Sequence, residues 1–349
     1  MQLQKDISLA AFTSLKVGGN AENFYLPSTY DDVVALLKTL PPSEACWFLG
    51  FGSNSLISDS GLPGATILWR GGNIELVEDE LVADAGAWWD DVVVYASNKQ
   101  LWGLELMSEI PSSVGGAVFG NIAAYGQQVS DTLSWVEVFD RNEQKIKRLK
   151  KEDITFAYRE SSLQSQTHLI ILRVAFKLAP HKLHDLRYAS AVAVAEELGS
   201  DTETLEGRRQ TIIETRRRAG SIYHPDDQDS QQTAGSFFKN PLVTIDQAKH
   251  LARYDETGKT LARIHEQNKI HGGDSHRASA AHVLLAAGFN RGQTWGNVRL
   301  HPDHVLKIET LEGATASDVH NVVKHIVMTV QDRLDITLTP EVRFLGDFS

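Results

Sequence analysis

The segment GSFFKNP at residues 235–241 combines side chains that can do chemistry with side chains that avoid water. Ser236, Lys239 and Asn240 supply a hydroxyl, a cation and an amide, and the two adjacent phenylalanines would be unfavourable in a surface loop. Ligand sites commonly hold a few aimed polar groups between apolar walls. The segment therefore predicts part of a ligand site, and Ser236 is the residue whose target has to be found.

A first glycine-rich stretch, GFGSNSLISDSGLPG, spans residues 50–64. Its leading glycines allow a tight turn, and Ser53, Asn54 and Ser55 add small hydroxyl and amide donors. Successive backbone N–H groups in such a turn form a concave anion site suited to a pyrophosphate. A plain strand-to-loop turn is the alternative. A Rossmann fingerprint is excluded, because Ser55 stands where the third glycine would be and no helical pattern follows at once.

A second stretch, IPSSVGGAVFGNIAAYGQQ, spans residues 110–128. Its proline, serines and glycines predict a loop against which a flat ligand can press, and Asn121 and Tyr125 add hydrogen-bonding side chains. A structural loop without a ligand is again the alternative. Two such stretches in one half of the chain favour a large cofactor that contains a pyrophosphate.

Three charged segments have weaker meaning by themselves. Arg159 in FAYRESS stands between a tyrosine and an acid, which is usually a surface ion pair of little worth. In PEVRFLG, Glu341 and Arg343 share one face of an expected strand and form either a structural pair or part of a site. The run 216–218 is three arginines, which is typical of a solvated helix face but also offers a local cluster for an anionic small molecule.

Other catalytic groups are not predicted. The 13 histidines lack the HExxH spacing and the accompanying acids of a metal site. There is no GxSxG elbow and no cysteine nucleophile. The single cysteine, Cys46, excludes an intrachain disulfide and a cysteine-based zinc site.

Length and composition limit the class of protein. A chain of 349 residues is long for one compact domain and predicts two or three lobes. Its net charge of −11 argues against broad nucleic-acid binding, which needs a basic face. No window approaches the ~18 apolar residues of a membrane span, and the N-terminus lacks the pattern of a signal peptide. These features predict a cytoplasmic enzyme.

The expected elements are mixed helices and strands, with strands too close together for a regular βαβ series. Residues 314–334 form the clearest amphipathic pattern, with Thr315 and Asp318 as the expected cap. A final strand with an edge or bend at Pro340 is expected near 336–346. Other helices are expected at 28–40 (capped by Ser28), 87–98, within 181–222, at 243–254 and at 277–289, and strands at 65–69, 74–78, 81–85, 135–140, 145–149 and 169–178.

Taken in order, six segments resemble the UDP-N-acetylenolpyruvoylglucosamine reductase family, also called UDP-N-acetylmuramate dehydrogenase or MurB, nearly end to end. AGSFFKNP and LTPEVRFLG are the most specific of the six. The family has two types, and LRYASA (186–191) is similar to the segment that carries a substrate-capping tyrosine in the first type. The supporting segments are FTSLKVGGNAE, LGFGSNSLISDSGLPG, LELMSEIPSSVGGAVFGNIAAYG and FAYRESS.

The resemblance implies an α+β protein of two domains. Residues 15–180 would be an FAD-binding domain of the vanillyl-alcohol oxidase (PCMH) type with two lobes. Residues 181–349 would be an α+β substrate-binding domain whose last strand, about 336–346, returns Glu341 to the site. The implied reaction is the NADPH-dependent, FAD-mediated reduction of UDP-N-acetylglucosamine enolpyruvate to UDP-N-acetylmuramate, an oxidoreductase step in peptidoglycan synthesis and hence in cell-wall formation, cell shape and division.

The resemblance also assigns the catalytic roles to Arg159, Ser236 and Glu341. Hydride addition to the enolpyruvyl group leaves negative charge that spreads into its carboxylate, and Arg159 suits that charge because its guanidinium is always cationic and forked. Ser236 would protonate the enol carbon, which answers what the serine of the first segment is aimed at. Glu341 would assist by sharing or donating a proton to the substrate carboxylate.

The implied ligands are non-covalent FAD, NADPH as co-substrate and a nucleotide sugar, with no nucleic acid, no membrane insertion and a monomeric cytoplasmic protein. FAD contacts are expected from Leu49, Gly50, Phe51, Gly52, Ser53, Asn54, Ser55, Leu56, Ile110, Pro111, Ser113, Gly115, Gly116, Gly120, Asn121, Ala123, Ala124 and Tyr125. Substrate contacts are expected from Tyr125, Arg159, Tyr188, Ser236, Lys239, Asn240, Arg277 and Glu341.

The chain departs from the family pattern in places. Ser112, Gly120 and Ala123 differ from the usual IPGTVG and QNIGAYG, and Tyr223 replaces a basic residue, so Arg277 or the run 216–218 would meet the diphosphate. Two alternatives remain: a related flavin oxidoreductase acting on another sugar or alcohol, and a non-catalytic flavin-binding protein. Against a covalent flavin oxidase, the first glycine-rich stretch has no histidine or cysteine to tether the flavin.

Overall fold

The computed structural model describes residues 3–224, 232–254, 262, 264 and 276–349. The chain forms two compact units. Unit 1 comprises residues 1–7, 21–51 and 63–228, and unit 2 comprises residues 8–20, 52–62 and 229–349. The first glycine-rich stretch is therefore divided between them. The boundary expected at residue 180 separates an FAD-binding domain from a substrate-binding domain. Because it is defined by ligand binding, it stays a prediction.

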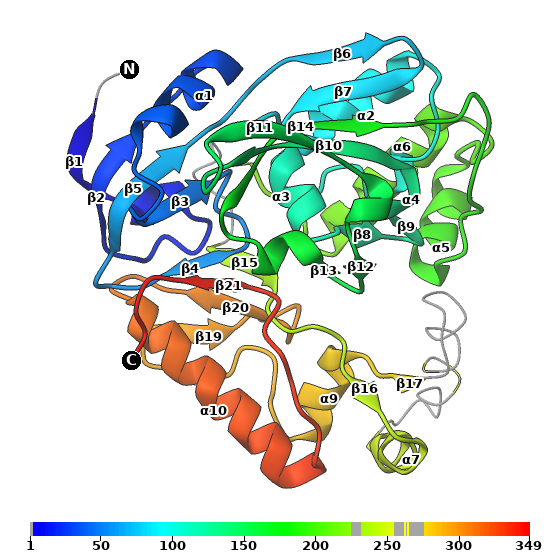
Figure 1. Cartoon of the computed structure of the whole chain (residues 1–349). Coiled ribbons are helices and arrows are strands. Elements are labelled where there is room, and N and C mark those ends of the chain that lie inside the picture. Colours follow the sequence, from blue (N-terminus) through cyan, green and yellow to red (C-terminus); the bar gives the residue numbers. More distant parts are fainter. Residues whose placement is uncertain (1–2, 225–231, 255–261, 263, 265–275) are drawn as a thin grey trace. The chain divides into compact units, whose positions relative to one another are not determined.

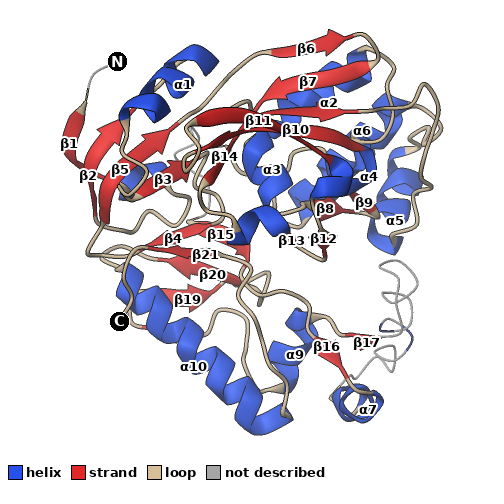
Figure 2. Cartoon of the chain, in the orientation of Figure 1, coloured by secondary structure: helices blue, strands red, loops and turns tan. Residues whose placement is uncertain are grey.

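Unit 1 contains two main sheets (Figure 2). One has the order β1-β2-β5-β3, and β3 and β5 pair in parallel; the other has the antiparallel order β11-β10-β14-β7-β6. Their strands are β1 (Gln4–Ser8), β2 (Asn20–Tyr25), β3 (Cys46–Leu49), β5 (Leu62–Leu68), β6 (Ile74–Val77), β7 (Glu80–Asp84), β10 (Leu133–Asp140), β11 (Lys145–Lys150) and β14 (Leu169–Phe176). The six strands expected from alternation are thus confirmed within a few residues.

Helices α1, α2 and α3 bury apolar faces against these sheets. Helix α1 places Val33 and Leu37 in one apolar cluster with Ile67 of β5, while α2 and α3 share another with β10 and β14. The helices are α1 (Tyr30–Thr39), α2 (Trp89–Asn98), α3 (Val114–Phe119), α4 (Val129–Thr132), α5 (Ala189–Leu198) and α6 (Leu205–Arg218), with 3-10 turns η2 (Glu105–Met107), η3 (Lys151–Asp153) and η4 (Ser162–Ser165). The expected cap at Ser28 is wrong by one residue, because Thr29 forms the capping box with Asp32.

Two short hairpins complete unit 1. They are β8 (Ala123–Ala124) with β9 (Gln127–Gln128), and β12 (Phe156–Ala157) with β13 (Glu160–Ser161). The first hairpin lies in the second glycine-rich stretch and the second in the FAYRESS segment, so both segments contain tight turns.

Unit 2 is built around the antiparallel sheet β15-β20-β19-β18 and the long helix α10 (Figure 1). Its elements are η1 (Ala10–Phe12), β4 (Ser55–Ile57), β15 (Thr233–Ser236), β16 (Leu242–Val243), α7 (Ile245–Ala252), β17 (His276–Arg277), α9 (Ala280–Ala286), β18 (Thr294–Trp295), β19 (Val298–Leu300), β20 (Lys307–Thr310), α10 (Ala316–Leu334) and β21 (Arg343–Leu345). The expected helix at 314–334 and its Thr315–Asp318 capping box are confirmed.

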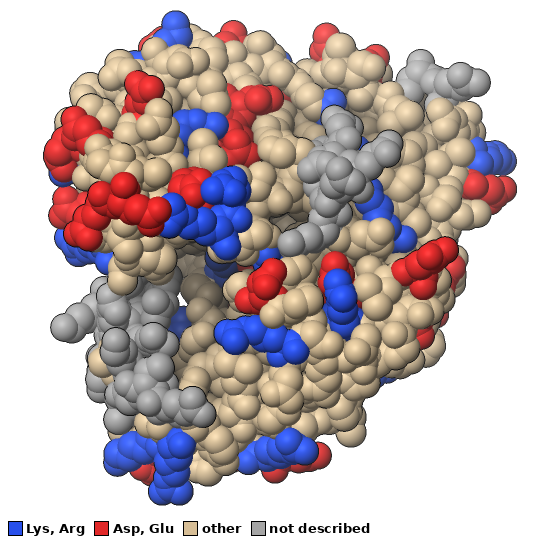
Figure 3. All heavy atoms as spheres, turned by 180° about the vertical axis from the view of Figure 1, so that it is seen from behind, with Lys and Arg blue, Asp and Glu red and all other residues tan. Residues whose placement is uncertain are grey.

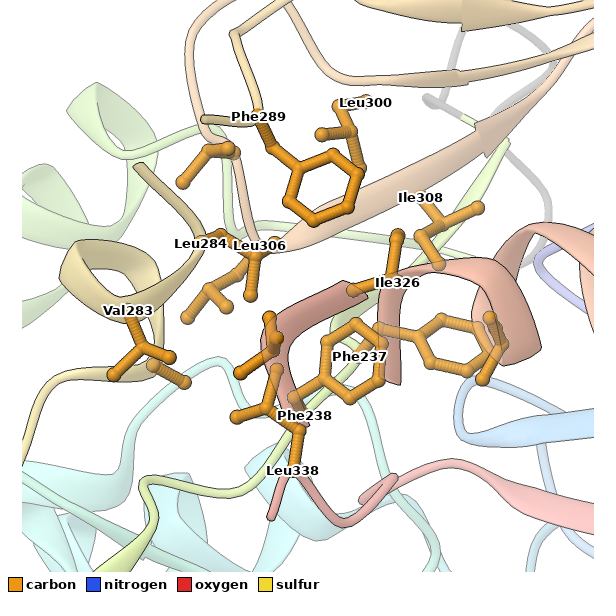
Figure 4. Packing of buried hydrophobic residues seen from close by; sticks show 14 of the residues in the cluster. Phe237, Phe238, Val283, Leu284, Phe289, Leu300, Leu306, Ile308, Ile326 and Leu338 are labelled. Carbon is orange, nitrogen blue, oxygen red and sulfur yellow. The ribbon is translucent and has the colours of Figure 1, made fainter. Parts of the chain in front are cut away.

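Phe237 and Phe238 belong to the core of this unit and do not form a surface wall. Their side chains are 0% and 2% exposed, and Figure 4 shows them packed among aliphatic side chains that include Ile326 and Leu338. Burying two aromatic rings fixes the backbone of the segment on either side of them. The polar residues Ser236 and Lys239 are therefore presented from a rigid base.

The last segment is less regular than the strand expected over 336–346. Only Arg343–Leu345 forms a strand, β21, and it pairs in parallel with β4. Before it, Pro340 makes an isolated antiparallel bridge with Phe238. Proline has no N–H to donate, so a longer ladder is interrupted there.

Charges on the surface are mixed. The face in Figure 3 shows Lys and Arg side chains beside Asp and Glu side chains. Within the described residues, no helix is both long and apolar enough to cross a membrane.

Cys46 on β3 is expected to be an unreactive thiol. Burial raises the pKa of this thiol to about 11, and only the thiolate is nucleophilic. At pH 8 we expect alkylation by iodoacetamide to be roughly a hundredfold slower in the folded protein than in urea. Equal rates in both states, followed by mass spectrometry, would contradict the burial of this side chain.

Asp59 is expected to stabilise unit 2 by capping α10. Its carboxylate accepts hydrogen bonds from the N–H groups of Ala316 and Ser317, both at 2.8 Å, and from the Ser317 hydroxyl at 2.6 Å. Asp59→Ala should lower the free energy of unfolding by about 1–2 kcal/mol in urea titrations. Asp332→Ala, an exposed change near the other end of α10, is the control and should change it by no more than about 0.5 kcal/mol.

Candidate active site

The glycine-rich stretches meet in unit 1 through Gly50 and Ser113. A Cβ atom added at Gly50 would lie 2.5 Å from Ser113 Oγ, so only glycine allows this approach. Arg70 fixes the turn by donating from Nε to the Gly50 carbonyl at 3.1 Å, and its guanidinium lies over the Phe51 ring at 5.2 Å. Two segments that are about 60 residues apart in sequence thus form one surface of backbone.

Ser113 also begins helix α3. Its hydroxyl accepts a hydrogen bond from the Gly116 N–H at 3.1 Å, which is an N-cap. Close approach favours glycine at position 115, since a Cβ there would lie 3.0 Å from the Cβ of Ala85. The sequence SSVGG therefore combines a cap with a helix start that lies against β7 and the residue after it.

A buried charged cluster holds the start of the second stretch. Asp90 of α2 is 5% exposed and accepts from the Glu109 N–H and from Arg209 Nη1, both at 2.7 Å. Burial and the nearby Asp90 raise the pKa of Glu109, whereas His224 and Arg209 lower it. The loop that begins at Ile110 is thus tied to both α2 and α6.

Asn121 is buried, so its side chain works within the protein. It is 1% exposed, its Nδ2 donates to the Ala157 carbonyl at 3.0 Å, and its Oδ1 accepts from the Ser130 N–H at 3.1 Å. These bonds join the second glycine-rich stretch to the β12–β13 hairpin and to α4. A cofactor contact from Asn121 stays a prediction. Because the side chain is already hydrogen-bonded within the protein, such a contact would use the backbone of Asn121.

Arg159 occupies the two-residue turn between β12 and β13. Ala157 pairs with Glu160, and Arg159 has a φ of +58°, a left-handed conformation that bulky residues rarely adopt. Its Nη1 donates to the Ala123 carbonyl at 2.8 Å. Strain of this kind concentrates at functional sites. The turn points the guanidinium back to the second glycine-rich stretch.

The aromatic residues expected to contact substrate meet in unit 1. The rings of Tyr125 and Tyr188 are 5.7 Å apart at 81°, an edge-to-face contact. Both pack on a small cluster that includes Leu106 and Ile212. Burial raises the pKa of the Tyr125 hydroxyl, and the nearby Arg216 guanidinium opposes this shift.

The arginine run is divided by the helix. Arg217 and Arg218 form exposed pairs with Glu214, as expected of a solvated face. Arg216 turns inward, donates from Nη2 to the Ser221 carbonyl at 2.7 Å, and has its pKa lowered by burial. Its position four residues after the fully buried Ile212 was the available sequence signal.

In unit 2, hydrogen bonds place Glu341 beside the GSFFKNP segment. The Glu341 N–H donates to the Phe237 carbonyl at 2.8 Å, and the Lys239 N–H donates to the Thr339 carbonyl at 2.9 Å. Ser236 directly precedes Phe237, is exposed, and pairs with Lys307 of β20. Two of the residues with expected catalytic roles are therefore on neighbouring backbones.

The first glycine-rich stretch lies on the other side of the same segment. The Arg343 N–H donates to the Asn54 carbonyl at 3.0 Å, and Asn54 Nδ2 donates to the Glu341 carbonyl at 3.3 Å. Leu56 is 0% exposed within the core of unit 2. An FAD contact from Leu56 would thus use its backbone.

Asn240 and Arg277 are joined by strand pairing. Leu242 of β16 lies opposite Arg277 of β17, and Arg277 Nη1 donates to the Asn240 carbonyl at 2.8 Å. The side-chain Oδ1 of Asn240 accepts from the Ala280 N–H at 2.9 Å at the start of α9. Their substrate contacts stay predictions. In the part of the chain that the structure describes, no three His, Cys, Asp or Glu side chains form a group able to hold a metal ion.

Comparisons place this geometry in a class. Residues 21–149 match the FAD binding domain family, and residues 226–345 match the family described as UDP-N-acetylenolpyruvoylglucosamine reductase, C-terminal domain. The fold and site thus define an FAD-dependent oxidoreductase.

Relatives narrow the class to one family. The UDP-N-acetylenolpyruvoylglucosamine reductase of Mycobacterium tuberculosis (strain H37Ra) is 32% identical over 355 residues, which cover 97% of this chain and 94% of that protein. The reductase of Thermobifida fusca is 30% identical over 354 residues, covering 98% of both. The crystal structure of MurB from Thermus caldophilus has the same fold, with a TM-score of 0.66 at 24% identity over 99% of this chain and 100% of that chain. The chain belongs to the UDP-N-acetylenolpyruvoylglucosamine reductase family.

Each glycine-rich stretch fits the anionic cofactor FAD. Residues 49–56 and 110–125 contain no acidic side chain that would repel a diphosphate. Gly52 has a φ of +65°, and a Cβ there would lie 2.1 Å from the Phe12 carbonyl oxygen, so the turn presents backbone only. Residues 49–56 also contain no histidine or cysteine that could form a covalent link to the flavin.

Gly50→Ala is expected to weaken FAD binding. The added Cβ meets Ser113 Oγ and must push Gly50 and Ser113 apart, which should raise the Kd for FAD about tenfold in fluorescence titrations of the apoprotein. In a Ser113→Ala background the same change should have a smaller effect, because the hydroxyl that it meets is gone. Equal effects in both backgrounds would show that the contact does not set the affinity.

Proposed function

We propose that this chain catalyses the NADPH-dependent reduction of UDP-N-acetylglucosamine enolpyruvate to UDP-N-acetylmuramate, a step in the synthesis of peptidoglycan precursors. The observation that supports it most is the hydrogen-bonded neighbourhood of Ser236 and Glu341, in a chain of this family. The alternative of another sugar or alcohol substrate has no comparable support.

The bound flavin supplies hydride transfer between NADPH and substrate. Reduction at the terminal carbon of the enolpyruvyl group leaves negative charge on the neighbouring carbon and its carboxylate. Arg159 would stabilise that charge, because its guanidinium is permanently cationic and its strained turn holds it in place before substrate arrives. Losing one preorganised donor of this kind typically lowers the rate by about 10²–10³.

Ser236 would deliver its hydroxyl proton to the enol carbon and regain one from solvent. The buried side chains of Phe237 and Phe238 anchor the backbone that follows this serine. Glu341 would hold the substrate carboxylate by a shared proton, and its backbone is fixed on both sides by Phe237 and Asn54. The proton donor and the assisting carboxyl group would thereby keep a constant spacing.

Binding of the anionic nucleotide sugar would use local cations in an otherwise acidic chain. Lys239, Asn240 and Arg277 would do so in unit 2, and Tyr125, Tyr188 and the inward Arg216 in unit 1. We also infer an FAD-binding domain at 15–180 and a substrate-binding domain at 181–349, and we expect the other residues of the two glycine-rich stretches to contact FAD. The enzyme would be a monomer in the cytoplasm. It would act on small molecules and bind neither nucleic acid nor membranes. The charge of −11 supports the expected lack of nucleic-acid binding, which needs a basic face.

An anaerobic two-step titration tests the proposal. NADPH should bleach the flavin absorbance of the purified protein, and UDP-N-acetylglucosamine enolpyruvate should then restore it without oxygen. A flavin that stays bleached would keep the cofactor but remove this substrate. A protein that binds no FAD would overturn the proposal.

Ser236→Ala should separate the two half-reactions. NADPH should bleach the flavin at a near-normal rate, whereas restoration by the enolpyruvyl substrate should slow by about 10²-fold or more, because the proton donor is missing. The control is Ser165→Ala, an exposed serine of unit 1, which should leave both half-reactions unchanged. Equal loss of both in Ser236→Ala would mean that Ser236 has a structural role only.

A further inference from the structure

The segment FTSLKVGG near the N-terminus has no role in the chemistry described above. It begins at Phe12, the last residue of η1, and contains two buried hydroxyl residues, Thr13 at 0% and Ser14 at 1% exposure. Buried hydroxyls need hydrogen-bond partners. The partners of these two differ, and the difference suggests a function for one of them.

Ser14 bonds to the first glycine-rich stretch. Its N–H donates to the Gly52 carbonyl at 3.1 Å, and its hydroxyl donates to the Ser53 carbonyl at 3.4 Å. The Cβ that Gly52 lacks would lie 2.1 Å from the Phe12 carbonyl oxygen. One side of the turn therefore lies directly on the backbone of residues 12–14. Ser14 donates two hydrogen bonds to the turn, one from its N–H and one from its hydroxyl.

This contact determines which way the peptide units of the turn face. No cis peptide bond occurs among the described residues, so the N–H and C=O of one unit point in opposite directions. With the carbonyls of Gly52 and Ser53 held toward Ser14, the N–H groups of Ser53 and Asn54 face the opposite side. Successive N–H groups on one side of a turn form an anion-binding concavity.

We propose that Ser14 is a positioning residue for FAD: it orients these two peptide units so that their N–H groups face the diphosphate. The inference deepens the proposed function, because it rests on the diphosphate being bound by this turn. Without the hydroxyl, the Ser53 carbonyl loses a donor and its peptide unit is free to rotate. A rotated unit would present a carbonyl oxygen to the diphosphate, and two negative groups repel each other.

Thr13 provides a matched control. Its buried hydroxyl donates to the carbonyls of Ala10 and Val17, both at 3.3 Å and both outside the glycine-rich stretch. Thr13→Val therefore removes a buried hydroxyl one residue away without touching the turn. Any general cost of such a change should appear equally in Thr13→Val and Ser14→Ala.

The test compares FAD binding by the full chain after removal of the flavin. Apoproteins of wild type, Ser14→Ala and Thr13→Val would be titrated with FAD by calorimetry, and their thermal unfolding recorded without FAD. We expect the Kd to rise about tenfold in Ser14→Ala and to stay within about twofold in Thr13→Val. Similar unfolding temperatures for both apoproteins would show that the effect is on binding.

Ser14→Cys covers the case in which the alanine variant does not fold. The thiol has nearly the same shape but donates weakly, so its Kd should lie between those of wild type and Ser14→Ala. A wild-type Kd in Ser14→Ala or Ser14→Cys, or an equal rise in Thr13→Val, would overturn the inference. The proposed function would fail in a different way, through a wild-type protein that binds FAD but is not reoxidised by the enolpyruvyl substrate.

Discussion

Hydrogen bonding between three short segments is the constraint on which unit 2 depends. Residues 339–345 lie between the GSFFKNP segment on one side and residues 54–57 on the other. None of the three is long enough to be stable alone, so each needs the others to satisfy its backbone groups. Because of this, a residue expected to donate a proton, a carboxylate and the turn expected to bind a diphosphate have fixed spacing, although they come from three distant parts of the sequence.

Unit 1 obtains its geometry from tight turns. Glu109, Asn121, Tyr125 and Arg159 have left-handed backbone conformations that are unfavourable for residues other than glycine. Each is held by contacts that repay the strain, such as the Asp90 carboxylate at Glu109 and the Ala123 carbonyl at Arg159. The second glycine-rich stretch and the Arg159 hairpin are therefore rigid before any ligand arrives, which is what electrostatic stabilisation of developing charge requires.

Electrostatics in the site is local and does not follow the net charge. The chain is strongly acidic, yet residues 49–56 and 110–125 contain no acidic side chain, and Arg159 and Arg216 are near the aromatic pair Tyr125 and Tyr188. Arg217 and Arg218 are neutralised by glutamates at the surface. Within one run of three arginines, helical phase alone separates the buried cation from the two solvated ones.

The sequence by itself determined the features that depend on neighbours along the chain. Alternation located six of the strands of unit 1, apolar spacing and the Thr315–Asp318 box located α10, and the order of the segments indicated the family. The tertiary structure decided whatever depends on which distant segment lies alongside. It placed Phe237 and Phe238 in the core, assigned the side chain of Asn121 to Ala157 and Ser130, and shortened the last strand to β21. Hydrogen bonds and burial between remote segments leave no local pattern, because either partner alone would fit many other surroundings.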